Sequence, residues 1–162
     1  MDEKGEQGED ADAGPRFGLR VSPGFQGWLN QRLCSLAVTT YQAGKLMFFG
    51  ARPDGGPWHF NRNIGRCLGL ALAGNELWVS ADHQVFRMID ALTPGTRGPG
   101  GEDAWYIPQQ GWFTGALDVH DMAIAADGRV LFVNTAFNCL AALIPSPLDA
   151  DSTRGIPKAA MI

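Results

Sequence analysis

Residues 117–143 read LDVHDMAIAADGRVLFVNTAFNCLAAL and contain the residue types best suited to chemistry. Asp118 and His120 are two residues apart, which places both side chains on one face of a β-strand and Asp121 on the other. A carboxylate beside an imidazole fixes the ring tautomer, so His120 could act as a general base or a metal ligand. The alternative is a polar corner that satisfies turn amides and holds neighbouring sheets in register.

A metal site would need several carboxylate, amide or imidazole ligands that converge on one point. The candidates in this part of the chain are Asp118, His120 and Asn134. All three come from one unit, so a metal-assisted, lactonase-like hydrolase would need further ligands from elsewhere. The sequence identifies no cofactor.

A second candidate region is the segment TTYQAGKL. Tyr41 and Gln42 could line a groove, and Lys45 could contact an anion. The alternative is a plain hairpin in which Gly44 supplies a positive φ angle and Lys45 begins a solvated strand. The full set of binding candidates is Tyr41, Gln42, Asp121, Asn134 and Thr135. His83 is expected to be a solvated turn residue.

Aromatic residues are frequent in the middle of the chain, and most are expected to pack between sheets. Some could instead stack on a sugar or a peptide. The seven that we consider are Trp58, Phe60, Trp78, Trp105, Tyr106, Trp112 and Phe113.

Composition indicates one globular domain, with 162 residues, 45% hydrophobic residues, 19% charged residues and a net charge of −4. The 13 Lys and Arg residues are scattered, so no basic stripe indicates a nucleic-acid partner. No run approaches the roughly 20 apolar residues of a membrane-spanning helix, and we expect a cytoplasmic protein without a membrane partner. We expect Cys34, Cys67 and Cys139 to be reduced core thiols.

The pattern divides the chain into four parts. Residues 1–16 are acidic and Gly-rich, which predicts a disordered tail. Residues 17–34 predict a linker and a short helix, with Ser22 as its cap and Pro23 at its first helical position. Residues 35–144 contain short apolar runs that Gly, Pro, Asn and Asp interrupt, which is typical of strands and tight turns. Residues 145–162 are expected to be irregular.

The β region contains three similar segments: LAVTTYQAGKLMFFG from Leu36, LWVSADHQVFRMID from Leu77 and LFVNTAFNCLAALI from Leu131. Each predicts a strand, a turn and a second strand. Gly74-Asn75 and Asp127-Gly128 mark hairpin turns that add a preceding strand to the second and third copies. An outer strand is expected near residues 104–107. The predicted units are 35–60, 64–107 and 112–144.

Units of four antiparallel strands that recur at this spacing predict an all-β, partial, about three-blade β-propeller-like array with a short N-terminal helix. A simple antiparallel sandwich is the alternative. Closed propellers use about 4 to 8 blades, so three units do not close a ring. Either two chains assemble, or the array keeps an open edge that could lead to self-association, or the chain is the front portion of something longer. The sequence after Leu143 lacks alternation and favours the last of these.

Several quoted segments together resemble an uncharacterised, mainly bacterial family described as conserved hypothetical protein 03032, or domain of unknown function 4915. They are SLAVTTYQAGKLMFFG, GLALAGNELWVS, QVFRMIDAL, YIPQQGWFTGALDVHDMAI and DGRVLFVNTAFNCLA. The resemblance implies a propeller-like β domain that continues through further blades, and no established reaction. This sequence departs from the family after residue 143. The matching positions are Thr40, Tyr41, Gln42, Gly44, Lys45, Asp118, His120, Asp121, Asn134 and Thr135.

Three hypotheses for function follow. The first is a binding module without catalysis that presents the propeller mouth to a small molecule or a protein partner. The second is the metal-assisted hydrolase, with Asp118, His120 and Asn134 at its site. The third is a truncated fragment without independent activity.

Overall fold

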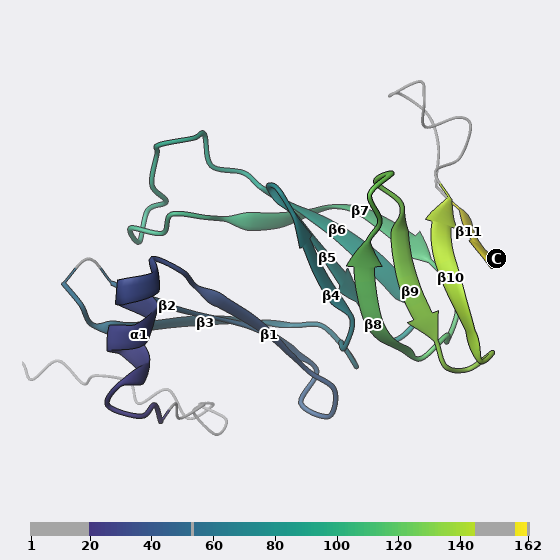
Figure 1. Cartoon of the computed structure of the whole chain (residues 1–162), viewed down its shortest axis with the longest axis horizontal. Helices are drawn as coiled ribbons and strands as arrows, with labels where there is room; N and C mark the ends of the chain where they lie inside the picture. Colours follow the sequence, from purple (N-terminus) through teal and green to yellow (C-terminus); the bar gives the residue numbers. More distant parts are fainter. Residues whose placement is uncertain (1–19, 53, 145–157, 162) are drawn as a thin grey trace, which may run out of the picture.

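The computed structural model describes residues 20–52 and 54–144, together with the backbone of 158–161 (Figure 1). The acidic segment 1–16 and most of the segment 145–162 lie outside the described residues. The described elements are α1 (Phe25–Arg32), β1 (Leu36–Thr40), β2 (Lys45–Ala51), β3 (Pro57–Asn63), β4 (Leu70–Ala73), β5 (Glu76–Ser80), β6 (Gln84–Asp90), β7 (Tyr106–Phe113), β8 (Val119–Ile124), β9 (Val130–Asn134), β10 (Cys139–Ile144) and β11 (Lys158–Met161).

The strands form three antiparallel sheets that follow one another along the long axis of the molecule (Figure 1). The first sheet has the order β1-β2-β3, the second β4-β5-β6-β7 and the third β11-β10-β9-β8. The second and third sheets thus have the four strands expected of each unit, whereas the first has three among the described residues. The fold is all-β and is consistent with a partial propeller-like array.

Two strands differ from the expected boundaries. The outer strand of the second sheet, β7, extends to Phe113, well beyond the expected 104–107, and its register against β6 shifts between Arg87 and Met88. The segment 145–162 was expected to be irregular, but Lys158–Met161 forms β11 beside β10. An edge strand is held by its backbone hydrogen bonds, so it can form without the alternation that would predict it.

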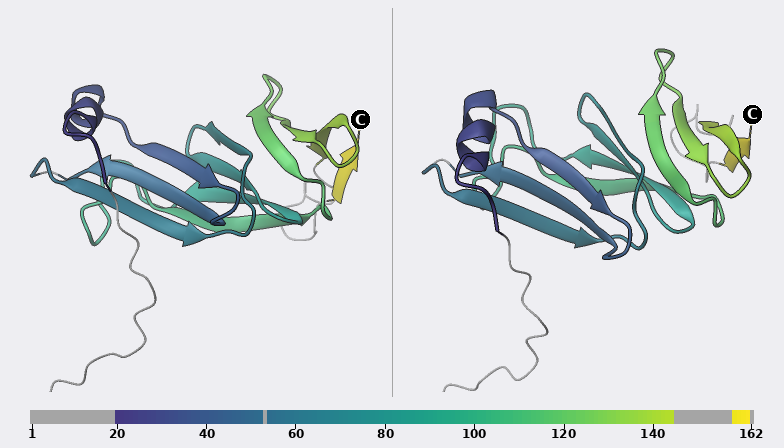
Figure 2. Two further views of the ribbon diagram at one scale, coloured as in Figure 1. Left: turned by 90° about the horizontal axis from the view of Figure 1, so that it is seen from below. Right: turned by 60° about the horizontal axis from the view of Figure 1, so that its bottom comes forward.

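The short helix α1 forms where predicted, but its cap is different. Gly24 is the N-cap residue and makes no side-chain capping bond, so the prediction of Ser22 as the cap is wrong. Ser22 contributes its carbonyl, which accepts a hydrogen bond from the backbone N–H of Phe25 at 3.1 Å. Leu29 is buried, and the ring of Phe25 meets that of Phe49 edge-on at 6.4 Å. The helix therefore packs on the first sheet, at the end of the array opposite β11 (Figure 2).

Two hydrophobic cores lie between successive sheets. The core between the first and second sheets contains Leu46, Cys67, Leu77, Val79 and Met88. The core between the second and third sheets contains Trp78, Val85, Trp112, Leu117, Val119, Met122, Val130, Phe132, Ala141 and Leu143. Each sheet alone would expose one of these faces, so stacking is what buries them. The three cysteines are free, and Cys67 is buried, whereas Cys34 and Cys139 are half-buried.

The repeat is displaced by one residue in its third copy. The sequence match equates Trp78 with Phe132, yet both lie in the core between the second and third sheets. Trp78 therefore faces the following sheet, whereas Phe132 faces the preceding one. A shift of one residue moves every side chain of a strand to the other face, so Phe132 faces the preceding sheet as Leu77 and Val79 do, and not as Trp78 does.

Hydroxyl groups join successive sheets at matching positions. Thr39 Oγ1 donates to the carbonyl of Leu68 at 2.6 Å, from the first sheet to the start of the second. Ser80 Oγ donates to the carbonyl of Val119 at 3.2 Å, from the second sheet to the third. Ser80 Oγ also accepts the backbone N–H of Gly69 at 2.8 Å, which satisfies a buried donor.

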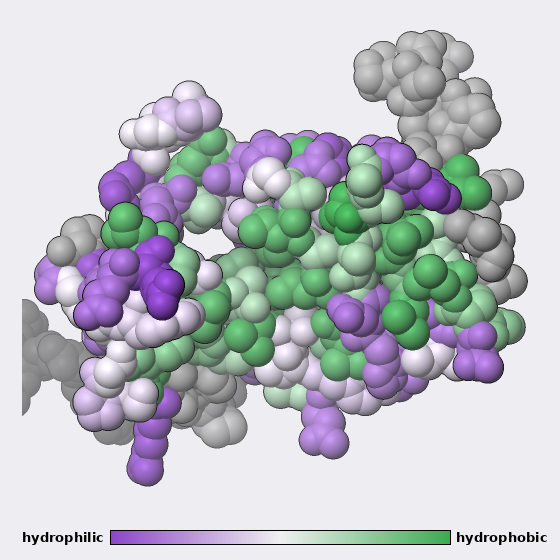
Figure 3. Space-filling view, in the orientation of Figure 1, coloured by the Kyte–Doolittle hydropathy of each residue, from purple (hydrophilic) through white to green (hydrophobic). Residues whose placement is uncertain are grey.

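The third sheet leaves its outer face uncovered by any other described sheet. Val133, Leu140 and Ile144 are 40%, 56% and 46% exposed on this face. Figure 3 shows apolar residues gathered over the region of β8, β9 and β10. The array thus has one end covered by α1 and one end with an exposed apolar surface.

Candidate functional site

Seven polar residues from all three sheets meet at one end of the array, and we call them the Arg66 cluster. They are Tyr41, Arg66, Asp82, His83, Asp118, His120 and Thr135. Most lie in the turns β1–β2, β5–β6 and β9–β10 or in the connections that lead into β4 and β8. This is the end at which the propeller mouth is expected.

Arg66 is the centre of the cluster. Its Cζ lies 4.9 Å from the centroid of the Tyr41 ring, and its Nη2 donates to the Tyr41 hydroxyl. Its guanidinium nitrogens lie 3.6 Å from Asp82 Oδ1 and 3.9 Å from Asp118 Oδ1. The hydrogen bond with Tyr41, followed by the smaller effect of the two carboxylates, raises the pKa of Arg66. One cation thus contacts side chains from all three sheets.

The backbone of Arg66 is held in an unusual conformation. Its φ angle is +50°, in the left-handed region that residues with a side chain seldom occupy. Asp118 has the same feature, with a φ angle of +49°. Each residue lies in the connection between the last strand of one sheet and the first strand of the next. Such conformations persist where the surrounding structure holds them, and they are frequent at functional sites.

Asp118 and His120 do lie together, with His120 Nε2 3.4 Å from Asp118 Oδ2. The reason differs from strand alternation, because β8 begins at Val119 and Asp118 precedes it in the left-handed conformation. Thr135 Oγ1 donates to the Asp118 carbonyl at 2.6 Å and lies 3.2 Å from Asp118 Oδ2. Asp118 is therefore positioned by both Thr135 and Arg66.

The other binding candidates are placed differently. Asp121 accepts the backbone N–H of Met122 at 2.8 Å and is exposed. Asn134 is fully buried and accepts the backbone N–H of Phe137 at 3.2 Å, which gives it a structural role in the β9–β10 turn. Gln42 is exposed in the same turn as Tyr41. The structure thus brings Tyr41, Asp118, His120 and Thr135 together and leaves these three outside the cluster.

The structure also places Lys45 and His83, which the sequence analysis considered as solvated residues near turns. Lys45 is the first residue of β2, after Gly44 with a φ angle of +56°, so the hairpin interpretation is confirmed. Lys45 Nζ donates to Asn63 Oδ1 at 2.8 Å. His83 is 59% exposed in the β5–β6 turn, as expected, and its Nδ1 lies 3.3 Å from Asp82 Oδ2.

The sequence analysis missed Arg66 and Asp82. Arg66 lies in NIGRC, which joins β3 to β4, and Asp82 lies in the turn after β5. In a four-stranded antiparallel unit, the turn between the second and third strands is at the same end as the connection to the next unit. Charged residues in both kinds of segment therefore meet at one end. This rule, applied to the repeat, would have found both residues.

The cluster is open to solvent and carries mixed charge. The side chains of Arg66, Asp82, Asp118, His83 and His120 are between 40% and 59% exposed. One guanidinium and two carboxylates are present, with two imidazoles beside the carboxylates. Such a set offers both donors and acceptors to a bound molecule. In the part of the chain that the structure describes, no group of three or more His, Cys, Asp or Glu residues could hold a metal ion.

Three antiparallel sheets stacked face to face, with a polar cluster at one end, define an all-β repeat domain. The model of the family DUF4915, a domain of unknown function, matches residues 23–147. The chain therefore belongs to this family. No curated protein matches it significantly. Among the described residues, no helix is both long enough and apolar enough to cross a membrane.

Proposed function

We propose that this domain is a binding module without catalysis, and that the Arg66 cluster takes a small polar molecule or a polar group of a protein partner. One observation carries the proposal: a single exposed cation contacts Tyr41 from the first sheet, Asp82 from the second and Asp118 at the start of the third. A site built from three units is formed only in the stacked array. Its geometry is then fixed by packing, which lowers the entropic cost of binding.

The charge of the cluster favours a ligand with both donors and acceptors. A simple anion would approach Arg66 but would meet Asp82 and Asp118 within 4 Å of the same guanidinium. A simple cation would meet the guanidinium itself. A ligand such as an amino acid, an amide or a polyol can accept from Arg66 and donate to the carboxylates.

The contact between Asp118 and His120 favours a second candidate function, a metal-assisted hydrolase. An imidazole beside a carboxylate is a common pair at metal and general-base sites. Further ligands would have to come from outside the described residues. Stoichiometric metal binding by the purified chain, lost in His120→Ala without loss of the fold, would support this candidate over the binding module.

The binding proposal is tested by a thermal-shift screen with glycine, arginine, acetamide, glucose and inorganic phosphate as probes. We expect at least one probe with both donors and acceptors to raise the melting temperature, because a ligand of the folded state stabilises it. Arg66→Ala should abolish the shift. Arg97→Ala, which changes an exposed arginine in the loop before β7, is the matched control and should keep it. Equal shifts for both variants would contradict the proposal.

A further inference from the structure

The first sheet lacks, among the described residues, the strand that begins each of the other two sheets. The sequence match aligns Leu36 of β1 with Leu77 of β5, the second strand of its sheet. β5 lies between β4 and β6, whereas β1 pairs with β2 alone. Figure 2 shows β1 along one side of the first sheet. We call the side of β1 away from β2 the β1 edge, and it is the position that β4 occupies in the second sheet.

The β1 edge presents the backbone groups of Ala37 and Thr39. Along an antiparallel strand, the N–H and C=O groups of successive residues point alternately to one side and to the other. The N–H of Lys45 points toward β1, because it donates to Oγ1 of its partner Thr40 at 3.0 Å. Thr40 therefore faces β2, and the groups of Thr39 and Ala37 point away from it. Such a row of donors and acceptors is a template for one more strand.

Thr39 makes only part of the hydrogen bonding that Ser80 makes at the matching position of the second sheet. Both hydroxyls donate to the sheet that follows. Ser80 also exchanges two bonds with the residue before β4: its N–H donates to the carbonyl of Gly69 at 2.9 Å, and its Oγ accepts the N–H of Gly69 at 2.8 Å. Within the described part of the chain, no donor pairs with Thr39 Oγ1. The acceptor that Gly69 uses on Ser80 is therefore available on Thr39.

The outer edges of the first two sheets carry residues that oppose pairing, and the β1 edge does not. β3 begins at Pro57 and contains Arg62, whereas β7 contains Pro108 and a shift of register. Proline, charged residues and bulges are common means of protecting an edge strand. β1 has the sequence LAVTT and pairs with β2 in a continuous register. Its sequence and its geometry favour a strand on both sides.

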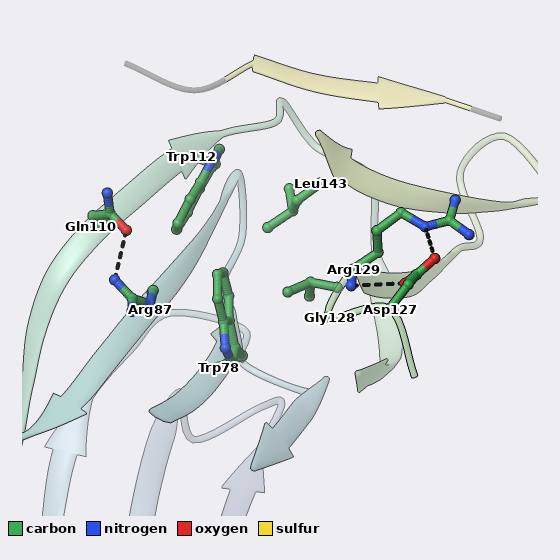
Figure 4. A pocket seen from close by; sticks show the side chains of 9 residues that line it. Trp78, Arg87, Gln110, Trp112, Asp127, Gly128, Arg129 and Leu143 are labelled. Carbon is green, nitrogen blue, oxygen red and sulfur yellow. Dashed lines mark hydrogen bonds and ion pairs between the residues drawn. The ribbon is translucent and has the colours of Figure 1, made fainter. Parts of the chain in front are cut away.

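The matching strand β4 indicates which residues fit on the face toward the second sheet. Trp78, which matches Ala37, lies with Leu143 in the space between the second and third sheets (Figure 4). Its partner on β4 is the small residue Ala71, which packs into the same core. The backbone of Gly69 is too close to the following sheet to accept a Cβ. An added strand therefore needs glycine opposite Thr39 and a small residue opposite Ala37.

The other face of an added strand meets apolar surface. Val38 is 40% exposed, and its match in the second sheet, Val79, is paired with Leu70 of β4. A leucine opposite Val38 would cover this side chain, and apolar pairs across two strands stabilise a sheet. The pattern that fits the β1 edge is thus Gly-Leu-Ala-Leu, which is the pattern of residues 69–72.

We propose that the β1 edge binds an extended segment of a partner protein as a fourth, antiparallel strand of the first sheet. Backbone donors and acceptors at strand spacing select a polypeptide, and strand addition is a general mode of peptide recognition. The position continues the row of inner strands in which β4 packs against β8. Where they are described, the ends of this chain lie elsewhere: residues 20–22 are exposed before α1, and β11 pairs with β10.

The probe is the peptide acetyl-Lys-Leu-Gly-Leu-Ala-Leu-Ala-Lys-amide, which carries residues 68–73 between two solubilising lysines. Binding is followed by hydrogen exchange of backbone amides in two-dimensional NMR. We expect the peptide to slow exchange at Ala37 and Thr39 by at least about tenfold, because their N–H groups become paired. Val38, which faces β2, should change little. Unchanged exchange at Ala37 and Thr39 with excess peptide would overturn the proposal.

The same measurement on the chain alone tests the source of the strand. We expect fast exchange at Ala37 and Thr39 without peptide, at every protein concentration. Slow exchange at both amides in dilute chain would mean that another segment of this chain covers the edge. Slow exchange that appears only as the concentration rises would mean that a second copy covers it. Either result would overturn the partner protein as the occupant.

Methylation of single peptide nitrogens separates strand addition from general apolar binding. In the proposed register, the N–H of the first alanine points to β1, and the N–H of the leucine before it points away. N-methylation of this alanine should weaken binding about tenfold, because it removes a hydrogen bond and adds a clash. N-methylation of the leucine should leave the affinity unchanged. Equal effects of the two changes would overturn strand addition.

Two neighbouring threonines give matched variants of the protein. Thr39→Val removes the acceptor for the glycine N–H and should weaken binding about fivefold, whereas Thr39→Ser keeps the hydroxyl and the affinity. Thr40→Val removes a hydroxyl that bonds Lys45 within the hairpin, and it should leave the affinity unchanged. Equal affinities for Thr39→Val and Thr40→Val would overturn the assigned register.

Discussion

The guanidinium of Arg66 lies over the ring of Tyr41, 4.9 Å from its centroid, and donates a hydrogen bond to its hydroxyl. Tyr41 follows β1 in the first sheet, and Arg66 precedes β4 in the second, so this pair joins two sheets at the expected mouth. Arg66 also approaches Asp118, which extends the connection to the third sheet. The pair is both a contact between units and the core of the proposed binding site.

Tyr41 contacts Arg66 both through its ring and through its hydroxyl, and two substitutions can separate these contacts. Tyr41→Phe keeps the ring under Arg66 but removes the hydroxyl, whereas Tyr41→Ala removes both. We expect a small fall in melting temperature for Tyr41→Ala and a smaller one for Tyr41→Phe, because exposed charge contacts contribute little. Circular dichroism melts provide the measurement, with Gln42→Ala in the same turn as the control. A larger loss in Tyr41→Phe than in Tyr41→Ala would be inconsistent with this geometry.

Ser80 is expected to matter more for stability, because it is buried. Its hydroxyl accepts the N–H of Gly69 and donates to the carbonyl of Val119. Ser80→Ala leaves both groups without this partner, and we expect a loss of about 1 to 3 kcal/mol in the free energy of unfolding. Ser22→Ala, at an exposed residue with no capping role for its side chain, should change it little. Chemical denaturation of the three proteins measures the difference.

Close packing of the second sheet against the third predicts a strong effect at Gly69. A Cβ added there would lie 2.5 Å from Met122 Cγ and 3.0 Å from Ser80 Oγ. Gly69→Ala should therefore destabilise the fold by about 1 to 3 kcal/mol. Gly65→Ala is the matched control, because nothing lies within 4 Å of a Cβ at that position. If both variants unfold at the same denaturant concentration, the two sheets do not pack as described.

The pair of Glu76 and Arg87 predicts a pH dependence. The hydrogen bond from Arg87 is the main cause that lowers the pKa of Glu76, against a smaller opposing effect of burial. A lowered pKa means that the ionised carboxylate stabilises the fold above its unfolded-state pKa, and that this contribution is lost as the pH falls through the lower, folded-state value. At pH 7, Glu76→Gln should reduce the free energy of unfolding by less than about 1 kcal/mol.

The difference between wild type and Glu76→Gln should then shrink as the pH falls below the ordinary glutamate pKa of about 4.3 and through the lower pKa of Glu76 in the folded state. Denaturation curves at a series of pH values measure it. A difference that stays constant, or that grows on acidification, would contradict the assigned pairing.

The exposed face of the third sheet predicts self-association. Leu140 and Ile144 are about half exposed on the same face, beside Val133. Exposed apolar surface of this kind drives association, and a charged residue placed there opposes it. We expect light scattering to show a mass above that of the monomer, and Leu140→Lys to lower it. Leu33→Lys, at a fully exposed leucine after α1, is the control. A monomeric wild-type chain would refute this prediction.

The sequence was sufficient to predict the strands and the turns between them. Gly44, Gly74 and Gly128 have the positive φ angles that their turns required, and the second and third sheets have the expected hairpins. Residue types at turns report local backbone geometry, which depends on few neighbours. Local rules were therefore reliable for these elements.

The sequence pattern could not predict which side chains of the third copy face the preceding sheet. The strands ELWVS and VLFVN carry apolar residues on both faces, although only the first is packed between two other sheets. A strand without polar alternation carries no signal for which residues face which neighbour. Trp78 and Phe132 were therefore matched by type, although they face each other across one core.

The candidate site was predicted in part for a related reason. Asp118 and His120 were found from their types and spacing, but Arg66 depends on contacts across 16 residues to Asp82 and 52 residues to Asp118. Only the stacking of the sheets brings these connections together. The spacing of residues within one unit therefore does not predict a site that is assembled from several units.

The most direct test of the binding proposal is the NMR response of the Arg66 side chain to the probe that raises the melting temperature most. The account predicts that the Arg66 Nε–Hε resonance and the backbone amides of Asp82 and Asp118 shift together, with one saturation curve. The three groups would then report a single site that joins the second sheet to the start of the third. Shifts confined to residues elsewhere, with these three resonances unmoved at saturation, would contradict it.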